Sequence, residues 1–145
     1  ACVQRVLVYG SETWPMKVED VQRLGRAERI MVRWMCSVTL KNRISNKEVY
    51  SHLNVEEVSD VVKRGRLRWF GHLERKSESD WVSACRYLDV GGKKKKGRSR
   101  KTWGECVKND LKHLGLERDW AHDRVRWRGL ICGIRPTRAC MDNGR

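Results

Sequence analysis

The spacing of apolar residues along the chain predicts a protein built from α-helices. Over most of the sequence these residues recur every three or four positions, which places them on one face of a helix. In the segment 18–38 the apolar face consists of Val21, Leu24, Met31, Trp34, Met35 and Val38. The other face of that segment carries Arg23, Arg26, Arg29 and Arg33. We therefore expect a long helix that packs its apolar face into a core and exposes its arginines.

Capping signals indicate where the next two helices begin. Ser45 and Glu48 fit a capping box, in which each side chain accepts a hydrogen bond from the other residue's backbone NH, so a short helix is expected over residues 46–53. Nine residues later, Asn54 and Glu57 fit a less typical version of the same device. They predict the start of a longer helix.

The longer helix is expected over residues 55–76. Its buried positions are predicted to be Val58, Val61, Val62, Trp69 and Leu73. Trp69 and Phe70 are adjacent, about 100° apart on a helix, so one can face the core while the other is half exposed. Gly65 weakens a helix by up to ~1 kcal/mol relative to alanine, which leaves a break open at that residue.

Two helices are expected near the C-terminal end. Thr102 and Glu105 form another capping box, which opens a helix over residues 103–114. Asp119 is the predicted cap of a last helix over residues 120–132. Beyond it, the tail contains Pro, Gly and Asn without any helical period, so we expect it to fray.

The remaining segments contain short elements. Ser79 is expected to cap a short helix over residues 80–88. Val3–Tyr9 is the one candidate strand, and it fits the end of a helix equally well. The fold class predicted from these patterns is all-α, an array of five to seven short helices with a flexible basic loop and a frayed C-terminal tail.

Aromatic residues are assigned to the core on the same pattern. Trp69, Trp103 and Trp127 are expected to be largely buried anchors. Tyr9 and Trp14 flank a turn at Gly10 and are expected to be structural, with Trp14 covering the next helix.

Composition divides the chain into four parts, with boundaries at residues 1–90, 91–101, 102–132 and 133–145. The second part opens with GGKKKKGRSR, which has neither an apolar nor an acidic residue and reads as a flexible basic loop. Such a run contacts phosphates, or it serves as a solvated loop or a nuclear localisation signal.

Charge points to the class of partner. The 145 residues include 32 Lys and Arg against 18 Asp and Glu, a net charge of +14, and such a surplus favours a polyanion, most commonly nucleic acid. An anionic membrane is disfavoured because the helices use their apolar faces for a core. The first candidate surface is the loop Lys93, Lys94, Lys95, Lys96, Arg98, Arg100 and Lys101. The second is a ridge formed by Arg64, Arg68, Arg124 and Arg128.

The chain contains no recognisable catalytic or metal-binding constellation. Its six cysteines show no C-x-x-C spacing, so we expect reduced thiols, with no metal and no cofactor in this chain. No Gly-rich phosphate loop, paired acidic motif or H-E-x-x-H motif is present.

Four stretches carry a family resemblance in their order and spacing: YGSETW (9–14), RGRLRWFGHLER (64–75), GRSRKTWGECVKNDLKHLGL (97–116) and DRVRWRGLI (123–131). Together they resemble the region downstream of the catalytic palm in reverse transcriptases of non-LTR (LINE-type) retrotransposons, closest to the RTE-like group. The family pattern often has Pro where Ser99 stands and an acidic residue where Gly104 stands, so the chain resembles a divergent copy.

The resemblance implies a thumb and post-thumb segment, with residues 1–90 as the thumb-like part. Such a segment grips template RNA and primer or target DNA beside an upstream palm of the same polyprotein. The palm motif Tyr-x-Asp-Asp is missing, since residues 87–90 read YLDV, so this chain alone resembles part of an RNA-directed DNA polymerase and is expected to be inactive. We expect a fragment of an intracellular, nuclear protein with no membrane partner and no small-molecule substrate. The alternatives are a free-standing DNA- or RNA-binding module derived from a retroelement, and a helical protein-interaction scaffold.

Overall fold

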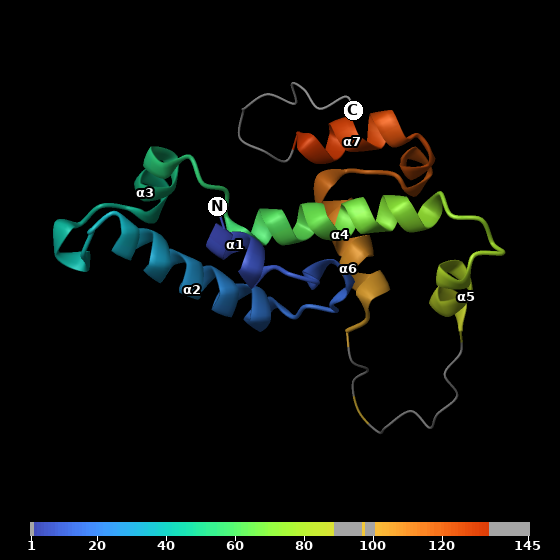
Figure 1. The fold of residues 1–145 in the computed structure, drawn as a ribbon, viewed down its shortest axis with the longest axis horizontal. Coiled ribbons are helices and arrows are strands. Elements are labelled where there is room, and N and C mark those ends of the chain that lie inside the picture. The colour runs from blue at the N-terminus through green and yellow to red at the C-terminus, as the bar shows by residue number, and fades with distance from the viewer. Residues whose placement is uncertain (1, 89–96, 98–100, 134–145) are drawn as a thin grey trace.

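The computed structural model describes residues 2–88, 97 and 101–133, and this part of the chain folds into seven α-helices without a strand (Figure 1). The helices are α1 (Cys2–Leu7), α2 (Val18–Met35), α3 (Asn46–Leu53), α4 (Val58–Glu74), α5 (Trp81–Tyr87), α6 (Trp103–Leu114) and α7 (Arg124–Cys132). Short 3-10 turns lie at η1 (Ser11–Thr13), η2 (Leu40–Asn42) and η3 (Arg118–His122). The all-α prediction is confirmed, and the strand alternative for Val3–Tyr9 is wrong because α1 occupies most of that segment.

Two of the predicted capping boxes form as expected. The backbone NH of Glu48 donates to Ser45 Oγ at 3.2 Å, and the NH of Ser45 donates to Glu48 Oε2 at 3.0 Å. In the Thr102–Glu105 box, the backbone NH of Glu105 donates to Thr102 Oγ1 at 3.3 Å, and the NH of Thr102 donates to Glu105 Oε2 at 3.0 Å. Both helices have the predicted bounds, because a side chain that satisfies a free NH group fixes the first helical residue.

Three predicted caps are wrong by a few residues. Asn54 does not start α4 but ends α3 in the left-handed conformation, with φ at 52°, and Glu57 precedes α4 instead. Asparagine tolerates this conformation better than most residues, which explains its place at a helix C-terminus. Asp80 rather than Ser79 caps α5, and Asp123 rather than Asp119 caps α7. Residues 118–122 form η3, so α7 starts later than predicted.

Helix α4 is the central element of the fold. Figure 1 shows it crossing the middle of the molecule, with α2 and η1 on one side and α7 on the other, and each of these packs against it. The larger core cluster consists of Leu67, Phe70, Val107, Ala121, Trp127 and Ile131. The smaller one consists of Met16, Val58 and Val62. α4 runs without a break through Gly65, so its two ends hold both clusters in one rod.

Two of the five predicted anchors of α4 are not fully buried. Val58, Val62 and Leu73 are buried as expected. Val61 and Trp69 are half-buried, and Phe70 occupies the core position beside Trp69. Trp127 is also buried as predicted, with 2% of its surface exposed, whereas Trp103 is half-buried at the edge of the core.

Several apolar residues that the pattern assigned to the interior lie on the surface. Trp34 and Met35, at the end of α2, are 81% and 64% exposed. This part of α2 extends past the end of α4, and in Figure 1 no described helix covers its outer side. Tyr9 is 84% and Trp14 is 47% exposed, so the turn at Gly10 is as predicted but the two aromatic side chains beside it are not buried.

A buried carboxylate joins the helices at the N-terminal end of α4. Glu28 is 3% exposed and accepts hydrogen bonds from Gln4 Nε2 at 2.8 Å, Tyr50 Oη at 3.0 Å and the backbone NH of Val58 at 2.9 Å. Burial and the neighbouring negative charge of Glu28 raise the pKa of Tyr50 well above its ordinary value. Glu28 therefore ties α1, α2 and α3 to the first turn of α4.

Candidate nucleic-acid interface

The packing of α7 on α4 positions the candidate basic ridge. The Trp127 indole Nε1 donates to the carbonyl oxygen of Leu67 at 3.0 Å, and Arg75 Nη1 donates to the carbonyl oxygen of Ala121 at 2.5 Å. The later residue on α4, Arg75, therefore contacts the earlier residue of the C-terminal segment, Ala121, whereas the earlier Leu67 contacts the later Trp127. Helices α4 and α7 are thus antiparallel.

A glycine allows this close approach. A Cβ atom on Gly71 would collide with the indole ring of Trp127, so only glycine lets the ring lie directly on the α4 backbone. The ring also packs against Phe70, with centroids 6.0 Å apart. Trp127 thereby fixes the rotation of α7 about its axis, and with it the direction of the arginines on its outer face.

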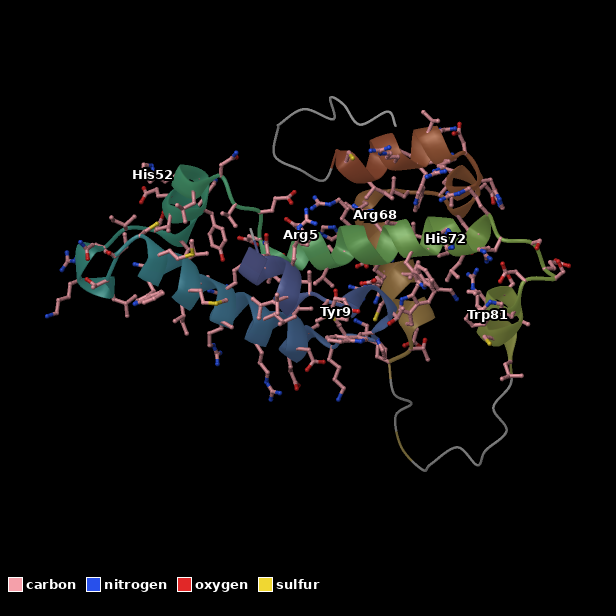
Figure 2. All side chains as sticks on the ribbon, in the orientation of Figure 1. Arg5, Tyr9, His52, Arg68, His72 and Trp81 are labelled. Atoms are coloured by element: carbon pink, nitrogen blue, oxygen red, sulfur yellow. The ribbon has the colours of Figure 1, made fainter. Side chains whose placement is uncertain are left out.

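Four arginines form one basic surface along this helix pair, which we call the α4–α7 ridge: Arg68, Arg75, Arg124 and Arg128. Arg124 and Arg128 are exposed and share a face of α7, being four residues apart. In the antiparallel register Arg124 lies near Arg75, and Arg128 is placed beside the Leu67–Gly71 stretch of α4, which includes the exposed Arg68. Figure 2 shows Arg68 on the side of α4 that faces α7.

The ridge holds like charges close together without an acid to balance them. Burial lowers the pKa of Arg75, and the positive charge of Arg124 lowers it further. Within the described residues, no carboxylate lies within ion-pair distance of Arg68, Arg124 or Arg128. Crowded guanidinium groups of this kind are stabilised by an anion, and phosphate suits their geometry.

Arg64 does not belong to this surface, contrary to the sequence-based expectation. It is 9% exposed, and its Nη1 and Nη2 donate to the two carboxylate oxygens of Glu56 at 2.5 and 2.6 Å. The hydrogen bonds that Arg64 donates to Glu56 raise the pKa of Arg64, although burial opposes this shift. The segment before α4 folds back over the first turns of the helix, which turns Arg64 into a structural residue. Sequence spacing could not reveal this.

A second buried arginine was not anticipated from the sequence. Arg66 is 4% exposed, and its Nε lies 2.9 Å from Asp110 Oδ2 on α6. Neither atom makes a well-directed hydrogen bond, so the two side chains interact as an ion pair through their opposite charges. Burial raises the pKa of Asp110, although the positive charge of Arg66 opposes the shift. This pair holds α6 on the side of α4 away from Arg68, since two residues turn a helix by about 200°.

Two further acids have structural roles, Glu74 between arginines inside the fold and Asp123 at the start of α7. The Glu74 side chain is 5% exposed, lies 2.6 Å from Arg86 Nη1 and accepts a 2.8 Å hydrogen bond from Arg118 Nε. Burial opposes ionisation of Glu74, but the hydrogen bonds from the two arginines outweigh it and hold its pKa below the ordinary value. Asp123 Oδ1 accepts from the backbone NH groups of Val125 and Arg126.

The basic loop can be placed only by its ends. Lys93, Lys94, Lys95, Lys96, Arg98 and Arg100 lie outside the described residues, as does the expected frayed tail beyond residue 133. Lys101 is half-buried just before α6. The loop joins α5 to α6, and its role stays a prediction, as does the division of the chain into four parts.

Aromatic side chains accompany the cations at the C-terminal end of α4. Trp69 and His72 stack with ring centroids 5.3 Å apart and planes inclined by 30°. Trp81, at the start of α5, is 75% exposed. The sequence pattern did not single out Trp81 because α5 is too short to show a helical period. Arg126 of α7 lies over the ring of Trp120 of η3 as a cation–π pair, with its Cζ atom 4.5 Å from the ring centroid.

Within the described part of the chain, no group of three or more His, Cys, Asp or Glu side chains is arranged to hold a metal ion. Among the described helices, none is both long enough and apolar enough to cross a lipid bilayer. Cys36, Cys85, Cys106 and Cys132 carry free thiols.

Comparison with known proteins gives one distant relative. Over 137 aligned positions the chain is 21% identical to a Caenorhabditis elegans protein whose name describes it as transposon-derived and uncharacterised. The alignment covers 86% of this chain and 49% of that protein, so the chain spans about half the length of this curated relative. No protein-family profile and no solved structure match the chain.

Proposed function

We propose that this chain is a noncatalytic nucleic-acid-binding segment of a LINE-type reverse transcriptase. In this role it grips template RNA and primer or target DNA for a palm domain located upstream in the same polyprotein, within the nucleus. The observation that carries the proposal is the α4–α7 ridge, where Arg124 lies close to Arg75 and no ion pair within the described residues engages Arg68, Arg124 or Arg128. Such a surface binds phosphates irrespective of sequence.

The arrangement of the family-like stretches supports the proposal. All four ridge arginines belong to two of them, since Arg68 and Arg75 lie in residues 64–75 and Arg124 and Arg128 in residues 123–131. The described parts of the other two stretches pack on α4. The turn at residues 9–14 contacts α4, and its Glu12 carbonyl oxygen accepts a 2.7 Å hydrogen bond from Trp103 Nε1.

The distant relative adds support of a coarser kind. A transposon-derived name agrees with a mobile-element origin for this chain. Coverage of about half of that protein agrees with a segment that works within a longer polypeptide. We therefore favour a part of a reverse transcriptase over a free-standing binding module.

The proposal is tested by removing the outer charges of the ridge. In Arg124→Ala/Arg128→Ala both side chains are exposed, so we expect the helical circular dichroism spectrum and melting temperature to remain close to those of the unaltered chain. Affinity for duplex DNA and for an RNA–DNA hybrid is expected to fall, and the slope of log K against log salt to flatten by about 2, because each lost phosphate contact removes close to one unit.

The matched control is Lys108→Ala/Lys112→Ala. These two exposed lysines have the same four-residue spacing, but they lie on α6, which packs on the side of α4 opposite the ridge. Removing them lowers the net charge equally and is expected to change affinity much less. Equal losses in the two variants would show that only overall charge matters. No binding by any of the proteins would instead support the interaction-scaffold alternative.

A further inference from the structure

We infer that a strip of α4 beside the ridge binds unpaired bases of a single-stranded segment. The strip, called the α4 strip below, consists of Arg68, Trp69, His72, Lys76 and Trp81. This inference rests on the proposed nucleic-acid-binding function and adds to it the kind of strand and the chemical group that are recognised. The ridge contacts phosphates only, whereas the strip presents ring faces between cations.

The helical spacing places the strip on one continuous surface. Arg68, His72 and Lys76 follow each other at four-residue intervals, so they form a row along α4 with steps of about 6 Å. Arg68 and His72 are exposed, and Lys76 is half-buried. Figure 2 shows Arg68 and His72 along α4 and Trp81 on the neighbouring α5.

Two aromatic groups flank this row. Trp69 is half exposed and stacks on the His72 ring. Trp81 is 75% exposed, far more than a core tryptophan such as Trp127 at 2%. An indole left in water at the start of a helix offers a large face for stacking.

The link between α4 and α5 joins Trp81 to the strip. Lys76 Nζ donates to Asp80 Oδ2 at 2.6 Å, and Asp80 Oδ1 accepts from the backbone NH of Val82. The hydrogen bond from Lys76 lowers the pKa of Asp80, and the charge of His72 contributes to the same shift. The residue before Trp81 is therefore held close to both His72 and Lys76.

This combination has the chemistry of a single-strand site. Every base has a π face, so bases stack on exposed tryptophan rings without regard to sequence, while nearby cations follow the phosphates. Paired bases cannot offer these faces because they are stacked within the duplex. Arg68 belongs to both the ridge and the strip, so a duplex on the ridge would continue into an unpaired strand on the strip.

The experiment compares three forms of one short duplex: blunt, with a single-stranded overhang, and with the same overhang built from abasic nucleotides. The full chain is expected to bind the overhang form several-fold more tightly than the other two. The abasic overhang keeps the phosphates, so any difference reports on the bases. A stacked base contributes about 1–3 kcal/mol, which corresponds to roughly 5-fold to over 100-fold in affinity.

Variants locate the site. Trp81→Ala is expected to abolish the preference for the base-containing overhang while leaving affinity for the blunt duplex unchanged, and Trp81→Phe is expected to retain most of it. The control is Trp34→Ala, which removes a tryptophan of similar exposure at the far end of α2 and should have no effect. The melting temperature verifies that each variant is folded.

The outcomes separate this inference from the proposed function. Equal affinity for the three forms, or a preference unaltered by Trp81→Ala, would overturn the α4 strip while leaving the ridge in place. Failure to bind any of the three would overturn the proposed function and the strip together.

Discussion

Single charged residues in this protein follow two different rules. Buried arginines and acids, such as Arg64 with Glu56 and Arg66 with Asp110, meet each other inside the fold. Exposed arginines such as Arg68 and Arg128 have no acidic partner among the described residues. Since the buried Arg66 and the exposed Arg68 lie only two residues apart on α4, the charge of a residue in the sequence does not reveal its role. Its position on the helix does.

Glu74 makes one of these internal contacts sensitive to pH. Its pKa is held below the ordinary value by Arg118 and Arg86, so the folded state favours the ionised form more than the unfolded chain does. The extra stability is present above the unfolded pKa of about 4.3 and is lost as the pH falls through the lower folded pKa.

We therefore expect Glu74→Gln to lower the melting temperature at neutral pH and to make it fall less steeply below about pH 4.5. Thermal unfolding followed by circular dichroism across this range measures both effects. Glu117→Gln, an exposed acid, is the control. Curves for Glu74→Gln and the unaltered chain that remain parallel down to acid pH would show that Glu74 provides no linked stability.

At the scale of helices, the contact between α4 and α7 depends on a missing side chain. Trp127 lies against Gly71, and the rest of the larger core cluster surrounds this contact. Gly65 is on the same helix, but nothing lies within 4 Å of the position where its Cβ would stand. Two glycines of one helix therefore differ completely in what they permit.

Replacing each glycine by alanine tests this difference. Gly71→Ala is expected to lower the free energy of unfolding by about 1–3 kcal/mol, because the new methyl group forces Trp127 away. Gly65→Ala is expected to raise it by up to about 1 kcal/mol, because alanine favours the helix and meets free space. Chemical denaturation measures both values. A stability for Gly71→Ala equal to that of Gly65→Ala would mean that Trp127 does not pack on the α4 backbone.

The helices also show how far the sequence alone leads. Capping boxes and apolar periodicity predict α3 and α6 to the residue, because both signals are local. The burial of Arg64 and the exposure of Trp34 depend on which segment lies across the helix, and no local pattern contains that information. The same limit separates Phe70 from Trp69, since periodicity assigned Trp69 to the core whereas the structure buries Phe70 there.

For the candidate site, sequence reasoning found three of the four ridge arginines. It added Arg64, which is buried, and missed Arg75 as a ridge member. The antiparallel register of α7 on α4 decides both cases, and it depends on Trp127 and Gly71 rather than on the arginines themselves. The loop of Lys93–Lys96 lies outside the described residues, so its part in binding stays a prediction from composition.

At the scale of the whole molecule, a net charge of +14 combines with a helical core in which Glu56, Glu74 and Asp110 pair with arginines. The fold therefore presents basic surface around a rigid α4. We propose that this surface grips nucleic acid, with the ridge and the loop as its two phosphate-binding parts.

The most direct test of this central claim is the salt dependence of binding to duplex DNA, measured for the unaltered chain and for a variant with Lys93–Lys96 replaced by alanine. Each contacted phosphate contributes about −0.9 to the slope of log K against log salt. We predict a steep linear slope, of which the loop alone provides roughly −3 if half its charges contact phosphate, and a flatter slope with weaker binding for the variant. Binding that is independent of salt and unchanged by the four replacements would contradict the account.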